Sequence, residues 1–248
     1  MAAEPGALYQ RQAQTLIASW RYFANWSSGA AIHEEPGVQV AVFPAAPERF
    51  VYNNALLELG LDRAESARAM DRVESLYAAA RVRTYALWVH EAEDRAGDEV
   101  RDRGYRLATS TRAMGMELDE LTVDRPSLDL GDADWEEHLR LIEGPEGLLE
   151  GIDPHPLNVV VARLCGVNAA SAIAYDFDGD CGLYNLGTVP ESRRQGIGTD
   201  VAALQLWNAR DRGCTTASIQ STEIAEGVYF SVGFRDLGRY LEYVRATE

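Results

Sequence analysis

The sequence contains no lysine, so all 23 of its basic side chains are arginine. Against them stand 39 Asp and Glu, which gives a formal net charge of −16. Nucleic acids and anionic membranes bind basic surfaces, and this balance therefore predicts neither as a partner. It favours a cationic or amine ligand only mildly, because solubility explains an acidic surface equally well.

Cysteine is also scarce, with only Cys165, Cys181 and Cys214. Their number and irregular spacing do not fit a disulfide framework or a structural zinc site. The histidines show no metal-ligand spacing such as His-Glu-x-x-His, so we expect no bound metal. Free thiols in a reducing compartment are the expected state of the three cysteines.

Long apolar runs are missing as well. No stretch approaches the roughly 18 apolar residues that a membrane-spanning helix needs. The first residues, Met-Ala-Ala-Glu-Pro-Gly, lack the basic and apolar segments of a secretory leader. Together with the shortage of cysteine, these absences predict a cytoplasmic protein.

Apolar residues that are present recur at helical or strand spacing along the whole chain. Helical spacing over 9–23 predicts a first helix, and Asp62 followed by Glu65 resembles a capping box that opens another. The combination of helices and strands predicts an α/β (α+β) fold. Strands are expected at 85–89, 106–118, 159–165, 169–175, 182–189, 217–220 and 235–244.

One stretch, 185–199, has the pattern of an anion-binding loop. It reads as a strand, a polar loop with Arg193 and Arg194, and two glycines where a helix opens. Unpaired N–H groups and the helix dipole favour a phosphate or pyrophosphate there. Gly196 and Gly198, having no Cβ, would let the backbone approach that anion. Arg193 could equally pack or pair with a carboxylate.

The two halves of the chain show the same order of elements, each closing a helix on Gly-aromatic before a long final strand. The spacing from Thr84 to Gly104 nearly matches that from Thr215 to Gly233. We interpret this as an internal repeat, with domains at residues 1–124 and 125–248. The place of the glycine loop in the first half holds no glycine, which predicts a degenerate repeat.

The second half resembles the GCN5-related N-acetyltransferase (GNAT) superfamily. The family's acyl-coenzyme A loop, Arg/Gln-x-x-Gly-x-Gly/Ala, is similar to Arg-Arg-Gln-Gly-Ile-Gly at 193–198. Its second signature, Asn-x-x-Ala-x-x-x-Tyr-x-x-x-Gly-Phe, is similar to 222–234, with Tyr229 at the tyrosine. The resemblance covers roughly residues 128–246 and implies a GNAT-like mixed sheet flanked by helices, in two related halves.

The resemblance also implies roles for individual residues. Tyr229 would protonate the leaving thiolate as a general acid. A backbone N–H near Val189 could stabilise the developing oxyanion. Thr222 stands where the family often has Asn. The residues implied to hold acetyl-coenzyme A are Gly187, Thr188, Val189, Arg193, Arg194, Gln195, Gly196, Ile197, Gly198, Thr199 and Thr222.

The general base stays open at this point. No carboxylate falls on 182–189, where the family often has one. Asp176, Asp178, Glu191 or a bridging water could take the proton, or the base could be absent. Asp176, Asp178 and Asp180 also imitate the start of a calcium loop, but the glycine stands at the wrong position, and we expect a hairpin turn.

These observations predict an N-acetyltransferase that moves acetyl from acetyl-coenzyme A, its co-substrate, to a primary amine of a small molecule. Both substrates would be bound when the amine attacks. One alternative is a non-catalytic module that binds acyl-coenzyme A as a sensor or scaffold. Another is a peptide or aminoacyl N-acyltransferase of the same fold. A homodimer is an open option.

Overall fold

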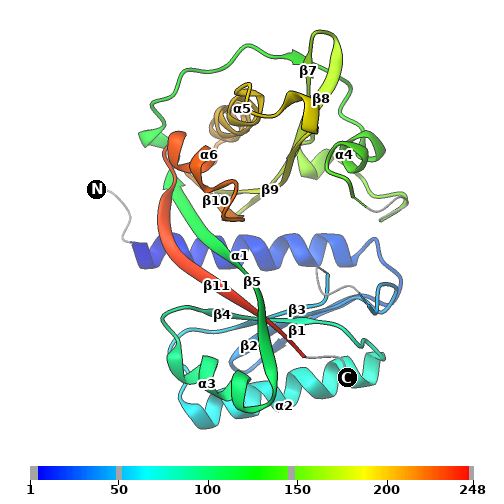
Figure 1. Ribbon diagram of the computed structural model, residues 1–248, viewed down its shortest axis with the longest axis vertical. Coiled ribbons are helices and arrows are strands. Elements are labelled where there is room, and N and C mark those ends of the chain that lie inside the picture. Colours follow the sequence, from blue (N-terminus) through cyan, green and yellow to red (C-terminus); the bar gives the residue numbers. More distant parts are fainter. Residues whose placement is uncertain (1–4, 49–51, 145–148, 246–248) are drawn as a thin grey trace. The chain divides into compact units, whose positions relative to one another are not determined.

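Figure 1 shows the computed structural model of the chain, which describes residues 5–48, 52–144 and 149–245. The chain forms two compact units, and each end of the sequence belongs to the unit that lies farther from it along the chain. Unit 1 comprises the residues through Ala18 together with Arg112–Leu237, and unit 2 comprises Ser19–Thr111 and the residues from Gly238 on. These units are defined by packing and not by ancestry, so the division into related halves at residue 124 stays a prediction.

Unit 2 is a mixed sheet with two helices of its own. Its strand order is β1-β2-β3-β4-β11, in which only β3 and β4 are parallel. The elements are β1 (Ala31–Glu35), β2 (Val38–Val42), β3 (Asn54–Leu57), α2 (Arg63–Ala80), β4 (Ala86–His90), α3 (Asp94–Asp102) and the last part of β11 (Arg235–Arg245).

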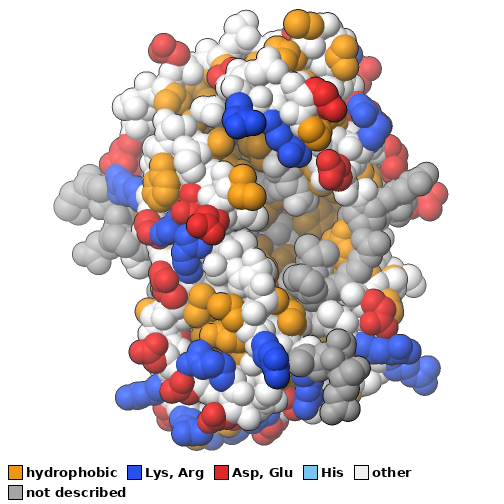
Figure 2. Space-filling model, in the orientation of Figure 1, with side chains coloured by type: hydrophobic (Ala, Val, Ile, Leu, Met, Phe, Trp, Pro, Cys, Tyr) orange, Lys and Arg blue, Asp and Glu red, His pale blue; other side chains and the backbone are white. Residues whose placement is uncertain are grey.

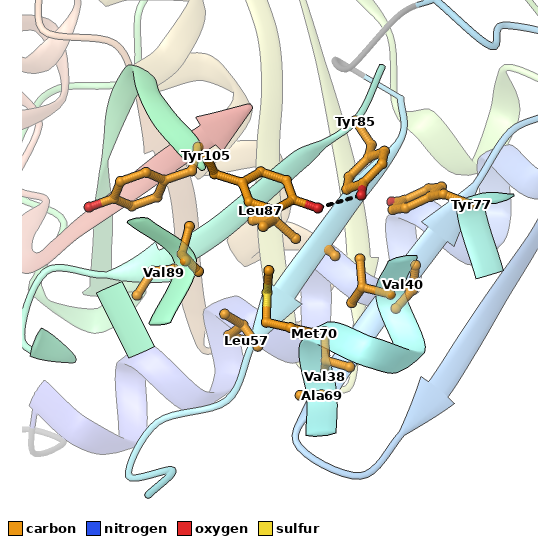
Figure 3. Close-up of a cluster of buried hydrophobic side chains, with 14 of the residues drawn as sticks. Val38, Val40, Leu57, Ala69, Met70, Tyr77, Tyr85, Leu87, Val89 and Tyr105 are labelled. Carbon is orange, nitrogen blue, oxygen red and sulfur yellow. Dashed lines mark hydrogen bonds between the residues drawn. The ribbon is translucent and has the colours of Figure 1, made fainter. Parts of the chain in front are cut away.

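Tyr77, Tyr85 and Tyr105, which Figure 3 labels, are buried in the core of unit 2, and the hydroxyl of each has a hydrogen-bond partner. The rings of Tyr77 and Tyr85 stack with their centroids 4.0 Å apart, and the hydroxyls of Tyr85 and Tyr105 share a hydrogen bond. The Tyr77 hydroxyl donates to the carbonyl oxygen of Ala41 at 3.0 Å. Large aromatic rings therefore fill this core without leaving their polar ends unpaired.

Unit 1 carries the glycine loop and has the strand order β5-β10-β9-β8-β7-β6. Only β9 and β10 are parallel, and the other neighbours are antiparallel. Its strands are the last part of β5 (Tyr105–Glu117), whose residues through Thr111 belong to unit 2, and β6 (Asp129–Leu130), β7 (Val160–Leu164), β8 (Val167–Phe177), β9 (Asp180–Thr188), β10 (Thr216–Ser221) and the start of β11. Its helices are the larger part of α1 (Pro5–Ala24), α4 (Trp135–Leu141), α5 (Ile197–Asp211), α6 (Glu226–Ser231) and the short 3-10 turns η1 (Leu118–Glu120), η2 (His155–Leu157) and η3 (Pro190–Ser192).

Helices cover both faces of the sheet in unit 1. Successive residues of a strand face opposite sides of the sheet, so neighbouring residues of β8 contact different helices. Ala170 and Ala172 of β8 pack with Val201 of α5 in one hydrophobic cluster. Ser171, between them, faces the other side and meets His138 of α4. The sheet therefore has an α5 face and an α4 face, which matters for every site residue below.

The predicted mixed α/β sheet flanked by helices is confirmed. Within the described residues, no helix combines the length and the apolar composition needed to cross a membrane. On the face shown in Figure 2, arginines and carboxylates are interspersed and do not form a patch of one sign.

The predicted capping box at the start of α2 is also confirmed. The Asp62 carboxylate accepts from the Glu65 N–H at 2.8 Å, and the Glu65 carboxylate accepts from the Asp62 N–H at 2.9 Å. Two N–H groups that the helix cannot satisfy internally are paired in this way.

Asp62→Ala should lower the free energy of unfolding by about 1 kcal/mol, because one helix N–H loses its acceptor. Urea unfolding followed by circular dichroism measures this change. Asp62→Asn, which keeps an acceptor at the same position, serves as the control. Equal losses in the two variants would show that the cap contributes nothing.

Candidate functional site

The central feature of unit 1 is an opening between its two parallel strands. Pairing joins Asp180–Leu183 of β9 to Thr216–Ile219 of β10 and stops there. Beyond this point β9 continues to Thr188, paired with β8 on its other side. The two strands therefore diverge, and their facing backbone groups become available to an extended ligand, as at any open strand edge.

A bulge in β9 accompanies the divergence. Ser171 of β8 lies opposite Gly187 and Ile173 lies opposite Tyr184, so that two residues of β9 face one residue of β8. Asn185, one of the two residues of β9 in the bulge, has a left-handed backbone with φ of 50°. A bulge bends its strand and increases the local twist, which directs the end of β9 away from β10.

The glycine loop lies at the end of β9 and opens α5. Arg194 and Gly196 both have left-handed backbones, with φ of 58° and 88°. Gly196 is the N-cap of this 15-residue helix and no side chain caps it. The first backbone bond of the helix is made by the Asp200 N–H, so the preceding N–H groups of 197–199 have no acceptor within the helix. This end of α5 suits an anion.

The two glycines of the loop are required for different reasons. A Cβ on Gly196 would meet open space, and only its positive φ demands glycine. A Cβ on Gly198 would lie 3.2 Å from Oγ1 of Thr188 and 3.6 Å from Cδ2 of Leu186. Gly198 therefore lets the first turn of α5 pack on β9, whereas the sequence suggested that it clears space for the anion.

Side chains of the loop brace it against its own backbone. The Arg193 Nε donates to the carbonyl oxygen of Thr188 at 2.9 Å. The Gln195 amide donates to the carbonyl oxygen of Glu191 at 3.0 Å. Arg193 thus holds its guanidinium group beside the end of β9, and Arg194 is exposed next to the unpaired helix N–H groups.

The end of β9 is packed closely on the α4 face. A Cβ on Gly187 would lie 2.9 Å from Cγ2 and 3.0 Å from Cα of Ile142, directly after α4. The N–H of Val189 donates to the carbonyl oxygen of Ala169 at 2.9 Å. The N–H of Val189 itself is therefore not available to an oxyanion, because β8 already uses it, and an oxyanion donor near Val189 stays a prediction for the other N–H groups of this segment.

Tyr229 lies on α6, directly after the end of β10. It is almost fully buried, its ring meets that of Phe234 edge-on at 5.8 Å, and it shares a cluster with Leu183 of β9. Burial raises the pKa of its hydroxyl, so the group stays protonated at neutral pH. Thr222, between β10 and α6, has an exposed side chain.

Two of the candidate bases lie at the wrong end of β9. Asp176 accepts two hydrogen bonds from Arg212, at 2.6 and 2.9 Å, and Asp178 forms the tight turn with Gly179. Both precede the start of β9, roughly 20 Å of strand away from Gly187 at about 3.3 Å per residue. The turn confirms the predicted hairpin.

Metal binding finds no support in the geometry of this segment. Asp180, the third carboxylate there, is buried and accepts from the hydroxyls of Thr216 and Ser218. Across the residues that the structure describes, no three His, Cys, Asp or Glu side chains are grouped to hold a metal ion.

His138 is the one histidine whose surroundings the sequence did not foretell. It is fully buried on α4, and its Nδ1 lies 2.8 Å from the Ser171 hydroxyl, which donates to the carbonyl oxygen of Val160 at 2.8 Å. The proton of the imidazole therefore lies on Nδ1. Nε2 is left as an acceptor that no described residue satisfies. Burial lowers the pKa of His138 to about 4.

No family model and no curated protein sequence matches the chain. Solved structures do. A GCN5-related N-acetyltransferase from Kribbella flavida aligns with a TM-score of 0.69 at 18% identity, covering 94% of this chain and 96% of that one. A GCN5-related N-acetyltransferase from Sphaerobacter thermophilus aligns with a TM-score of 0.64 at 12% identity, covering 98% and 94%.

An acetyltransferase of the GNAT family from Colwellia psychrerythraea aligns with a TM-score of 0.57 at 13% identity and covers 99% of each chain. The alignments extend over nearly the whole chain and not only over the stretch with the glycine loop. The chain therefore has the GNAT fold, as the resemblance implied. The tandem origin of its two halves stays a prediction.

The buried His138 should make stability depend on pH. Its pKa is about 4 in the folded state, below the ordinary value of 6.5, so the unfolded chain binds more protons between these values. Its contribution is full above about pH 6.5 and falls as the pH drops towards 4, by about 3 kcal/mol in total.

Urea unfolding at pH 7.0 and pH 4.5, in the parent and in His138→Asn, tests this dependence. The Asn amide can still donate to Ser171 but does not titrate. The parent should lose more stability than the variant over this range, and equal losses would show that His138 titrates normally.

Proposed function

We propose that the protein is an acyl-coenzyme A-dependent N-acetyltransferase that transfers acetyl from acetyl-coenzyme A to a primary amine of a small molecule. The observation that carries the proposal is the divergence of β9 and β10 beside the uncapped N-terminus of α5. The shared fold with structures named as acetyltransferases supports it.

In this proposal the pantetheine arm lies along the end of β9. Backbone groups of Gly187 and Thr188 would bind it in the manner of an added strand, whereas the N–H and the carbonyl of Val189 are already bonded to Ala169 and Ser192. The pyrophosphate would lie at the residues 194–199, where unpaired N–H groups and the positive end of the α5 dipole meet. Arg193 and Thr222 would border the same ligand.

The chemistry needs few groups beyond correct placement. The amine nitrogen attacks the thioester carbon, the C–S bond breaks, and Tyr229 gives its proton to the leaving thiolate. The proton of the amine passes to solvent or to a base. Glu191, exposed in the turn directly after β9, is the candidate base nearest in sequence to the end of β9.

A second candidate function is a module that binds acyl-coenzyme A without catalysis. The observation that favours it is the lack of a carboxylate on β9 near the bulge, together with the remote position of Asp176 and Asp178. Binding experiments alone do not separate the two functions, and turnover does.

Binding is tested by thermal unfolding with and without acetyl-coenzyme A. At 100 times the dissociation constant the ligand should add about 2.7 kcal/mol of stability. Arg194→Glu should reduce this gain, because it reverses the charge beside the helix N–H groups. Arg210→Glu makes the same charge change in the last turn of α5 and should keep the gain. No gain in the parent would contradict the proposal.

Turnover is tested by thiol release from acetyl-coenzyme A with a panel of small primary amines. Tyr229→Phe should lower kcat by about 10²-fold, because the thiolate loses its proton donor, while the affinity for coenzyme A hardly changes. Unchanged turnover in the variant would remove Tyr229 from the chemistry. Binding without turnover of any amine by the parent would favour the sensor.

A further inference from the structure

Gln220 lies on β10 at the point where this strand stops pairing with β9. It directly follows Ile219, the last residue of β10 that pairs with β9. Ile219 packs in the cluster on the α5 face, so its neighbour Gln220 faces the opposite side of the sheet. Gln220 is therefore the first residue of β10 beyond its pairing with β9, and its side chain lies on the face of the sheet opposite α5.

The side-chain amide of Gln220 has an unused donor. Its Nε2 is buried and has no hydrogen-bond partner among the described residues. A buried amide N–H without an acceptor is rare in folded proteins, because the group has lost water and gained nothing. An acceptor atom of a bound ligand would restore the lost hydrogen bond.

The donor character of this group indicates which atom of the substrates it suits. An attacking amine needs its lone pair free, and an N–H that binds this lone pair would weaken the nucleophile. The thioester oxygen is an acceptor and gains negative charge as the amine attacks. The N–H of Val189 itself is already bonded to the carbonyl oxygen of Ala169 and does not serve in that role.

We propose that Gln220 donates a hydrogen bond from Nε2 to the acyl oxygen of acetyl-coenzyme A, and holds the oxyanion that forms there. The inference rests on the proposed function. As the N–C bond forms, the C=O electron pair moves to the oxygen facing Gln220. The pair returns as the C–S bond breaks, the thiolate takes the proton of Tyr229, and the amine proton leaves to solvent, which reprotonates the tyrosine.

The proposal is tested without knowing the amine, because coenzyme A lacks the acyl oxygen. Calorimetry gives the affinities of acetyl-coenzyme A and coenzyme A for the parent, Gln220→Met and Gln220→Glu. Met keeps the side-chain length, and Glu keeps the shape without the N–H. Both variants should lose about three- to tenfold in affinity for acetyl-coenzyme A relative to coenzyme A, as expected for one hydrogen bond.

Gln195→Met is the matched control. Its amide is already bonded to Glu191, and the change should affect both ligands equally. The infrared carbonyl stretch of ¹³C-acetyl-coenzyme A gives an independent readout. It should lie at lower frequency when bound to the parent than when bound to Gln220→Met, and turnover of an accepted amine should fall about 10²-fold.

The outcomes separate the two proposals. If the parent binds neither ligand, the proposed function fails and this inference fails with it. If both ligands bind and Gln220→Met leaves their affinity ratio and the carbonyl frequency unchanged, the function survives and Gln220 has another partner, such as an ordered water. Thermal unfolding of each variant shows that the fold is retained.

Discussion

The candidate site depends on one irregularity, the bulge in β9. Two residues of β9 face a single residue of β8, and the strand bends where Asn185 adopts a left-handed backbone. Because of this bend, β9 stays beside β8 while it leaves β10. The segment of β9 that contains Gly187 and the end of β10 at Gln220 then lie beyond the last β9–β10 pair, and α5 packs beside β9 because Gly198 allows contact with Thr188.

The sequence predicted most of the fold because its helices and strands carry strong local patterns. Met70, Val73 and Tyr77 mark the buried face of α2, and its capping box sets where the helix begins. The strand β1 (Ala31–Glu35) was missed. It pairs with β2 alone, and its polar stretch His33-Glu34-Glu35 lacks the alternation that marks a half-buried strand.

The sequence predicted only those features of the candidate site that depend on residues close together in the chain. The glycine loop is a local motif, but the use of its glycines depends on β9 packing against α5. The bond from Val189 to Ala169 depends on strand register. His138 follows Trp135 by one helical turn, so its inward direction was readable, but its bond to Ser171 needs the fold. Gln220 stands out only once the end of strand pairing is known.

The exchange of chain ends between the units makes the molecule hard to divide. Residues through Ala18 pack with the unit that carries the glycine loop, and Leu8 lies against Gly115 of β5. The described residues from Gly238 on pack with the other unit. Deleting the first helix would therefore expose buried side chains of unit 1, although most of that unit is far from the helix in the sequence. Unit 1 is not continuous in the sequence, so producing it by itself would require the segment that ends at Ala18 to be joined to Arg112–Leu237.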